Sequence, residues 1–167
     1  MIRENDVIEI INEAEEHGIP VFLDGGWGVD ALMEKQTRAH NDIDLFMEKR
    51  HGETFVGLLK RKGFNEVPKE YTTPAHTVWQ DEQNRIVDLH LYEPGGDGSF
   101  LFEGNRYPAD TFSAVGRIAG KAVRCIPPRE QVLFHCGYET DANDVHDVKL
   151  LCERFGIPVP EEYANRG

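Results

Sequence analysis

Residues 21–30 read Val-Phe-Leu-Asp-Gly-Gly-Trp-Gly-Val-Asp and residues 42–45 read Asp-Ile-Asp-Leu, and these two stretches decide the fold. The first begins with a short apolar run typical of a buried strand, continues through a glycine-rich turn and leads into a helix. The second belongs to the next strand, which the pattern predicts over residues 43–47. The order strand, glycine turn, helix and strand indicates a sheet with helices against it.

Asp42 and Asp44 have the pattern of metal ligands. Side chains alternate across a strand, so the two carboxylates lie on one face while Ile43 and Leu45 lie on the other. Carboxylates about 7 Å apart along one strand repel each other unless a cation lies between them. Oxygen ligands of this kind suit Mg²⁺, which shares the rest of its coordination shell with water and phosphates.

A third carboxylate, Asp88, lies in the alternating segment at residues 86–91, where Asp88 and His90 share one face. A carboxylate in such an apolar run costs free energy unless it has a partner. If this strand pairs with the strand of Asp42 and Asp44, the three carboxylates converge and can hold two metal ions. Two such ions can activate an attacking hydroxyl and neutralise a leaving pyrophosphate.

Gly25 and Gly26 follow a strand and open a helix, so their backbone N–H groups and the helix N-terminus are offered to an anion. The segment is not a P-loop, because no Gly-Lys-Ser/Thr ends it. Taken singly, a glycine pair is more often a tight turn, and an Asp-x-Asp or a lone strand Asp can be an ordinary polar face. Their joint occurrence in this order favours a functional site.

The rest of the chain predicts further helices and strands around this centre. A first helix capped by Asn5 or Asp6 ends at Gly18, and a third helix closes at Gly63. The remaining expected elements are a hairpin over residues 76–92, short strands over 100–126, helices over 128–134 and 143–155, and a frayed tail after Pro160. The fold class is α+β (α/β-like), with one mixed sheet and helices packed on one face.

Composition narrows the function classes. The chain has 167 residues, with 30 Asp and Glu against 18 Lys and Arg and a formal net charge of −12. Such a surface repels phosphate backbones, which argues against a nucleic-acid partner but allows a cationic small molecule. Charged residues among the first twenty argue against a signal peptide, and no stretch is long and apolar enough for a membrane span, so a cytoplasmic protein is expected. The three cysteines are expected to be reduced, buried thiols.

The motifs resemble those of a known family. Residues 23–30, the pattern Arg38-x-His40-x-Asp42-Ile43-Asp44, and Leu133-Phe134-His135-x-Gly137-Tyr138 look like the lincosamide nucleotidyltransferases of the short, single-domain type. Aminoglycoside nucleotidyltransferases resemble the chain less closely, at the first two blocks. The resemblance implies a polymerase-β-like nucleotidyltransferase fold, with residues 1–126 as the core domain and residues 127–167 as a C-terminal helical elaboration of that domain.

The resemblance also implies residue roles. Asp42 and Asp44 would hold Mg²⁺ and the NTP, and Asp88 would complete the metal site and act as general base or orient the acceptor hydroxyl. Gly25 and Gly26 would cradle the triphosphate.

Other candidate residues keep two interpretations each. Arg38 and His40 would contact phosphate or lock Asp42, with a surface Arg and a structural His as the alternatives. Lys149 lies at the flank of the apolar face of the last helix, so it would reach a phosphate or extend along the edge of the core. His135 is as compatible with a hydrogen-bonded core residue as with a ligand, whereas Trp27, Trp79 and Tyr92 are expected in the core.

The expected activity is Mg²⁺-dependent transfer of a nucleoside monophosphate, AMP from ATP, to a hydroxyl of a small-molecule antibiotic, with a lincosamide as the leading acceptor. The alternatives are an aminoglycoside or macromolecular acceptor, and a non-catalytic nucleotide-binding or antitoxin-like module. No His or Cys pair has the spacing of a closed zinc site, and there is no nucleophile-elbow motif. Exposed sheet edges make a homodimer reasonable.

Overall fold

The computed structural model describes residues 1–166; Gly167, the last residue of the expected C-terminal elaboration, lies outside the described residues. The strands are β1 (Phe22–Asp24), β2 (Asp42–Glu48), β3 (Asn65–Glu66), β4 (His76–Gln80), β5 (Ile86–Pro94), β6 (Phe100–Phe102), β7 (Asn105–Tyr107), β8 (Ala114–Ile118) and β9 (Lys121–Cys125). The α-helices are α1 (Glu4–Glu16), α2 (Gly25–Met33), α3 (Gly52–Arg61), α4 (Pro128–Phe134), α5 (Ala142–Phe155) and α6 (Glu161–Ala164). Two 3-10 turns, η1 (Lys49–His51) and η2 (Ala109–Phe112), connect them.

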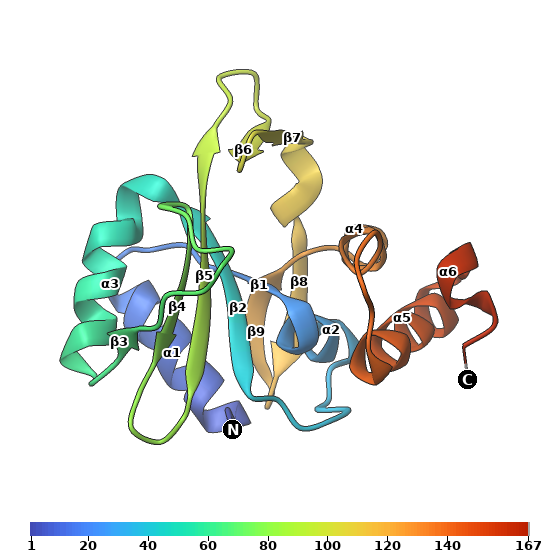
Figure 1. The fold of residues 1–167 in the computed structure, drawn as a ribbon, viewed down its shortest axis with the longest axis horizontal. Helices are drawn as coiled ribbons and strands as arrows, with labels where there is room; N and C mark the ends of the chain where they lie inside the picture. The colour runs from blue at the N-terminus through green and yellow to red at the C-terminus, as the bar shows by residue number, and fades with distance from the viewer. Residues whose placement is uncertain (167) are drawn as a thin grey trace.

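One mixed sheet runs through the molecule in the order β3-β4-β5-β2-β1-β9-β8, and the β6–β7 hairpin extends from β5 (Figure 1). The pairs β2–β5 and β1–β9 are parallel, whereas the other neighbours along this order are antiparallel. The expected mixed sheet with helices is therefore confirmed. The hairpin over residues 76–92 is also present, as β4 and β5.

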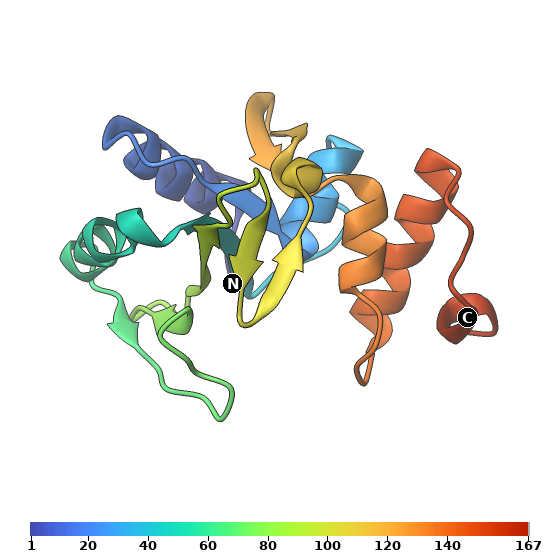
Figure 2. The same ribbon diagram turned by 90° about the horizontal axis from the view of Figure 1, so that it is seen from above.

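The face of the sheet that packs against helices follows from the alternation of apolar side chains along β2. Ile43, Leu45 and Met47 are fully buried and join the main hydrophobic cluster. That cluster also contains apolar residues of α1, α2 and α3. The helices α4, α5 and α6 lie together at one end of the molecule, on the right in Figure 2, and α4 and α5 contact α2.

The opposite face of the sheet carries a second, aromatic cluster, formed by the side chains next along the alternation. Phe22, Phe46, Tyr92 and Ile126 are buried there. The residues packed against them are Phe100, Phe102, Phe112 and Phe134. Because Phe46 shares its face with Asp42 and Asp44, the aromatic cluster lies beside these carboxylates on the same side of the sheet.

Some local expectations were wrong. Neither Asn5 nor Asp6 is the cap of α1: the N-cap is Arg3, whose backbone N–H donates to Asp6 at 2.8 Å. The tail after Pro160 is not frayed, because it forms α6 and buries Tyr163 completely. Trp27, Trp79 and Tyr92 are buried, as expected. All three cysteines are free, and Cys125 and Cys152 are buried, but Cys136 is only half-buried. Within residues 1–166, no helix has the length and apolar character that crossing a bilayer requires.

Candidate active site

Three carboxylates from two neighbouring strands meet on the face of the sheet that the helices α1–α3 leave open. The parallel pairing of β2 and β5 places Asp44 directly opposite Asp88, and Asp42 lies on the same face of β2. One carboxylate oxygen from each of the three lies within 4.8 Å of the others. The structure thus brings together all three side chains for which the sequence predicted a metal site.

The charges of this carboxylate cluster oppose one another. Burial, followed by repulsion from Asp42, Asp88 and Asp24, raises the pKa of Asp44 well above its usual value. Burial and the neighbouring Asp88 likewise raise the pKa of Asp42. A divalent cation would relieve this repulsion, and a donor set of carboxylate oxygens alone is the set that suits Mg²⁺. The three residues therefore fit the metal ion that the sequence implies.

The glycine pair lies at the N-terminus of α2, next to the carboxylate cluster. Gly25 has a φ of +59°, and a Cβ at this position would overlap the carboxylate of Asp44. A Cβ on Gly26 would come within 2.5 Å of both Arg38 and His40. Both glycines are thus required because other side chains of the protein approach the backbone closely. Their N–H groups at the helix start are available to an anion.

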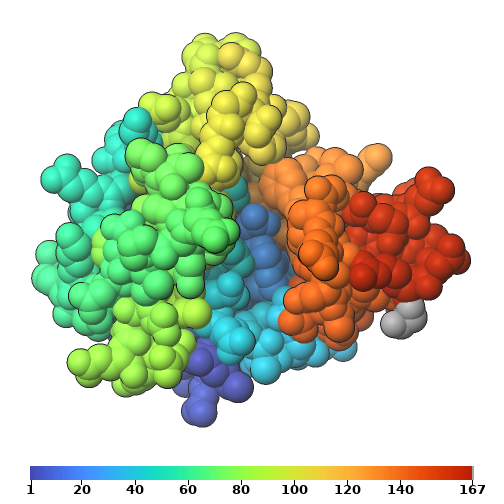
Figure 3. All heavy atoms as spheres, in the orientation of Figure 1, coloured from blue at the N-terminus to red at the C-terminus, as the bar shows by residue number. Residues whose placement is uncertain are grey.

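A cavity of about 420 Å³ opens beside the carboxylates. Figure 3 shows a hollow whose floor is coloured blue and cyan and whose right wall is formed by the orange helical region. The residues lining the cavity are Asp24, Gly25, Gly26, Arg38, Ala39, Asn41, Asp42, Asp44, Phe134, His135, Tyr138, Asp141, Asn143 and Asp144. With five aspartates and one arginine among them, the cavity favours cations.

Arg38 lines this cavity but is held by a buried carboxylate. Its Nε and one terminal nitrogen donate to the two oxygens of Asp147 at 2.9 and 2.7 Å. Although burial acts to lower the pKa of Arg38, the hydrogen bond to Asp147 raises it overall. Asp147 is in turn 3.8 Å from His135, whose Nδ1 bonds the carbonyl oxygen of Gln131. Arg38 therefore has a structural partner as well as access to the cavity.

His40 and Lys149 are not brought to the cavity wall. His40 is buried, with Nε2 at 2.5 Å from Asp30 and its ring against Trp27. The amino group of Lys149 donates to the backbone carbonyl of Arg166 at the C-terminal end. Neither placement supports the expected contact with phosphate. His40 has the geometry of its structural alternative, whereas Lys149 makes a contact that neither of its interpretations predicted.

Sequence reasoning missed two partners of the site. His76 on β4 donates through Nε2 to Asp88 at 2.6 Å, and Asp147 holds Arg38. A signal for Asp147 exists in the sequence, because it lies between Val145 and Val148 on the inward face of the last helix. The signal for His76 is weaker: in the hairpin it pairs directly with His90, a register that depends on the turn length.

Comparisons with known proteins find relatives that match most of the chain. A family model described as aminoglycoside-2''-adenylyltransferase matches residues 6–151. The chain is 31% identical over 156 residues to a lincosamide resistance protein of Staphylococcus haemolyticus, covering 90% of this chain and 94% of the relative. It is 44% identical over 167 residues to a 2''-aminoglycoside nucleotidyltransferase of Klebsiella pneumoniae, covering 89% and 85%.

Among solved structures, the chain is similar to the crystal structure of the lincosamide antibiotic adenylyltransferase LnuA with lincomycin bound. The TM-score is 0.79 at 30% sequence identity, over 90% of this chain and 96% of the other.

Proposed function

The chain belongs to the aminoglycoside-2''-adenylyltransferase family, and from that premise we propose that it transfers AMP from ATP to a hydroxyl of a lincosamide antibiotic, releasing pyrophosphate. It is a nucleotidyltransferase with a polymerase-β-like fold. The observation that carries the proposal is the meeting of Asp42, Asp44 and Asp88 beside the N-terminus of α2.

Asp42, Asp44 and Asp88 would hold Mg²⁺ in this enzyme. When bound, the metal supplies charge neutralisation on the phosphate oxygens and lowers the pKa of a coordinated hydroxyl. The backbone N–H groups of Gly25 and Gly26 bind triphosphate oxygens at the start of α2. The negatively charged cavity orients a cationic acceptor by charge.

Asp88 takes the proton of the acceptor hydroxyl. The hydrogen bond from His76 fixes one carboxylate oxygen of Asp88 and so holds the carboxylate on the open face of β5. General bases of this kind typically contribute about 10²–10⁴-fold to rate. The reaction uses cellular ATP, so we place the enzyme in the cytoplasm.

A lincosamide acceptor is supported by the relative from Staphylococcus haemolyticus and by the lincomycin-bound structure. An aminoglycoside is a second candidate, because the family model and the Klebsiella pneumoniae relative carry that name. The two candidates differ only in the acceptor and share the carboxylate cluster.

Mass spectrometry tests the proposal. The purified protein is incubated with ATP, GTP, CTP or UTP and with lincomycin, clindamycin or aminoglycosides, with and without Mg²⁺. We expect an AMP adduct on a lincosamide that requires Mg²⁺. Adducts on aminoglycosides alone would select the second candidate, and no adduct despite tight binding of Mg-ATP would favour a non-catalytic module.

Asp88→Asn tests the assigned base. We expect turnover to fall by at least about 10²-fold while much of the nucleotide affinity remains. Glu16→Gln, an exposed carboxylate at the end of α1, is the charge-matched control and should keep full activity. Full activity in Asp88→Asn would remove the role given to this residue.

A further inference from the structure

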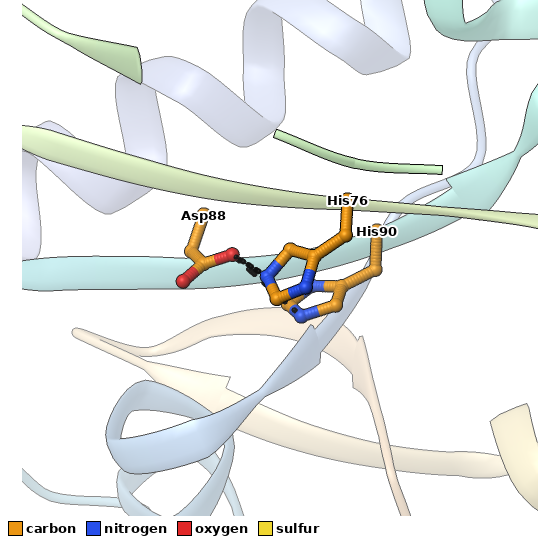
Figure 4. A group of neighbouring side chains, drawn as sticks. All are labelled: His76, Asp88 and His90. Atoms are coloured by element: carbon orange, nitrogen blue, oxygen red, sulfur yellow. Dashed lines mark hydrogen bonds and ion pairs between the residues drawn. The ribbon is translucent and has the colours of Figure 1, made fainter. Parts of the chain in front are cut away.

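A second cluster of ligating side chains lies next to the three carboxylates and shares Asp88 with them. His76 on β4 and His90 on β5 are cross-strand partners, and Asp88 lies two residues before His90 on the same face. One ligand atom from each of the three lies within 4.8 Å of the others. Figure 4 shows the two imidazole rings stacked beside the carboxylate.

The ring nitrogens of both histidines are oriented by other groups. His90 Nδ1 donates to the carbonyl oxygen of Leu45 at 3.3 Å, which leaves Nε2 with a free lone pair, 3.6 Å from Asp88 Oδ1. His76 Nε2 faces the same oxygen at 2.6 Å, and its Nδ1 lies 3.9 Å from Glu103. Metal-binding histidines typically direct their second nitrogen to a carbonyl or carboxylate in this way.

Aromatic side chains hold the two rings in place. The rings of His76 and His90 stack with centroids 4.3 Å apart. Phe46 stacks on His90 at 4.6 Å, Phe102 meets it edge-on at 5.5 Å, and Tyr71 lies 5.0 Å from His76. The side chains of His76, Asp88 and His90 are still 12–17% exposed, so a solvated ion can reach them.

We propose that His76 Nε2, Asp88 Oδ1 and His90 Nε2 bind a divalent transition metal ion of the zinc class. Two imidazoles and one carboxylate form a donor set that selects zinc-like ions over magnesium. Ligand atoms around tetrahedral zinc lie about 3.3 Å apart. Asp88 Oδ1 lies 2.6 Å from His76 Nε2 and 3.6 Å from His90 Nε2, on either side of that value. The ion takes the place of the proton between His76 and Asp88, and water completes the coordination. The spacing of His and Cys pairs in the sequence, which marks closed four-ligand zinc sites, does not reveal an open site with three ligands.

Binding of this ion would affect catalysis, and this consequence rests on the proposed function. Asp88 belongs to both clusters, so an ion held by the histidines withdraws it from the acceptor hydroxyl and from Asp42 and Asp44. Zinc therefore inhibits nucleotidyl transfer at saturating Mg²⁺, and the histidines set the concentration at which it does so.

Cobalt binding tests the site without reference to activity. The full chain, stripped with EDTA, is titrated with Co²⁺, and the visible absorption bands of the bound ion are followed, with Zn²⁺ as competitor. We expect saturable binding of one ion, displaced by Zn²⁺ but not by millimolar Mg²⁺. His76→Gln and His90→Gln should each weaken binding by at least about tenfold. Two variants, His17→Gln at an exposed histidine and Asp42→Asn in the neighbouring cluster, should retain it.

Three outcomes would overturn the proposal: no saturable binding, binding that survives in the His76→Gln/His90→Gln double variant, or equal loss in Asp42→Asn. Circular dichroism checks that each variant is folded. If His90→Gln fails to fold, cobalt binding by the His76→Gln variant, whose substitution is at a partly exposed position, decides the result. Cobalt binding together with a complete lack of nucleotidyl transfer would refute the proposed function and leave this metal site standing.

Discussion

At the scale of single residues, Asp44 is in an environment that opposes folding of the metal-free protein. Burial and three neighbouring carboxylates raise its pKa, so between the unfolded pKa, about 4, and the folded pKa, the native state binds more protons than the unfolded state. Stability is therefore lost as the pH rises through this window. Above the folded pKa, the metal-free protein carries the whole free-energy cost of the buried charge.

We expect Asp44→Asn to stabilise the metal-free protein while abolishing transfer. In EDTA at pH 7, removal of the buried charge should raise Tm by about 3 °C, the shift that roughly 1 kcal/mol gives in a chain of this size. The loss of stability between pH 4 and pH 7 should also become smaller. Thermal melts with and without Mg²⁺ measure both effects, and a lower Tm in EDTA would contradict the electrostatic argument.

Arg38 and Asp147 present the opposite case, because their charges are matched. Although burial acts to raise the pKa of Asp147, the hydrogen bonds from Arg38 and the nearby His135 lower it overall. The stabilisation is therefore present at neutral pH and lost as the pH falls through the folded pKa. We expect Arg38→Ala to cost up to about 3–5 kcal/mol, because Asp147 would be left buried with only His135, 3.8 Å away, as a partner. Urea unfolding measures this cost.

The double variant Arg38→Met/Asp147→Leu is the control for that measurement. It removes both charges and should recover most of the lost free energy. If Arg38→Ala alone costs less than about 1 kcal/mol, the pair is not the restraint on α5 that its geometry indicates.

At the scale of elements, the start of α2 is where backbone conformation and the carboxylate cluster meet. We expect Gly25→Ala to destabilise the fold and abolish Mg²⁺ binding, because its φ is positive and its Cβ would displace Asp44. Gly18→Ala is the matched control, since its φ of +68° brings the same strain but its Cβ meets nothing within 4 Å. The control substitution should lower the free energy of unfolding by only about 1–2 kcal/mol and leave Mg²⁺ binding intact. Equal effects in calorimetry would contradict the clash.

A second prediction at this scale concerns the C-terminal helix α6. Tyr163 is fully buried, and its hydroxyl donates to the backbone carbonyl of His135. We expect Tyr163→Ala to cost about 3–5 kcal/mol and Tyr163→Phe about 1 kcal/mol, as measured by chemical unfolding. A neutral Tyr163→Ala would show that α6 is dispensable.

Local patterns predicted most of the elements, because they depend on periodicity. The alternation around Asp42, Asp44 and Asp88 predicted the face on which each carboxylate lies. It did not predict that β2 and β5 pair, because that contact joins segments far apart in sequence. Tyr163 was missed because it contacts His135, a residue 28 positions earlier in the chain. The contact of Lys149 was missed because a helix face does not reveal the nearby carbonyl of Arg166.

At the scale of the whole molecule, the excess of acidic residues extends into the cavity. The homodimer expected from the sheet edges stays a prediction, whereas the charge gives a direct test. For an amine-bearing acceptor we expect KM to rise several-fold between about 0.05 and 0.5 M salt, because ions screen attraction beyond a few ångströms. An acceptor with an acetylated amine should show little change in steady-state kinetics. A salt-independent KM for the charged acceptor would contradict this electrostatic attraction.

The position of β1 between β2 and β9 has a consequence for biosynthesis. Its two partners are made at different times, one soon after it and the other only when most of the chain has been translated. A nascent chain cannot complete its sheet until residues near 125 have left the ribosome. A chain that is terminated before this point should therefore have no partial activity. It should remain unfolded and be degraded by the quality-control proteases of the cell.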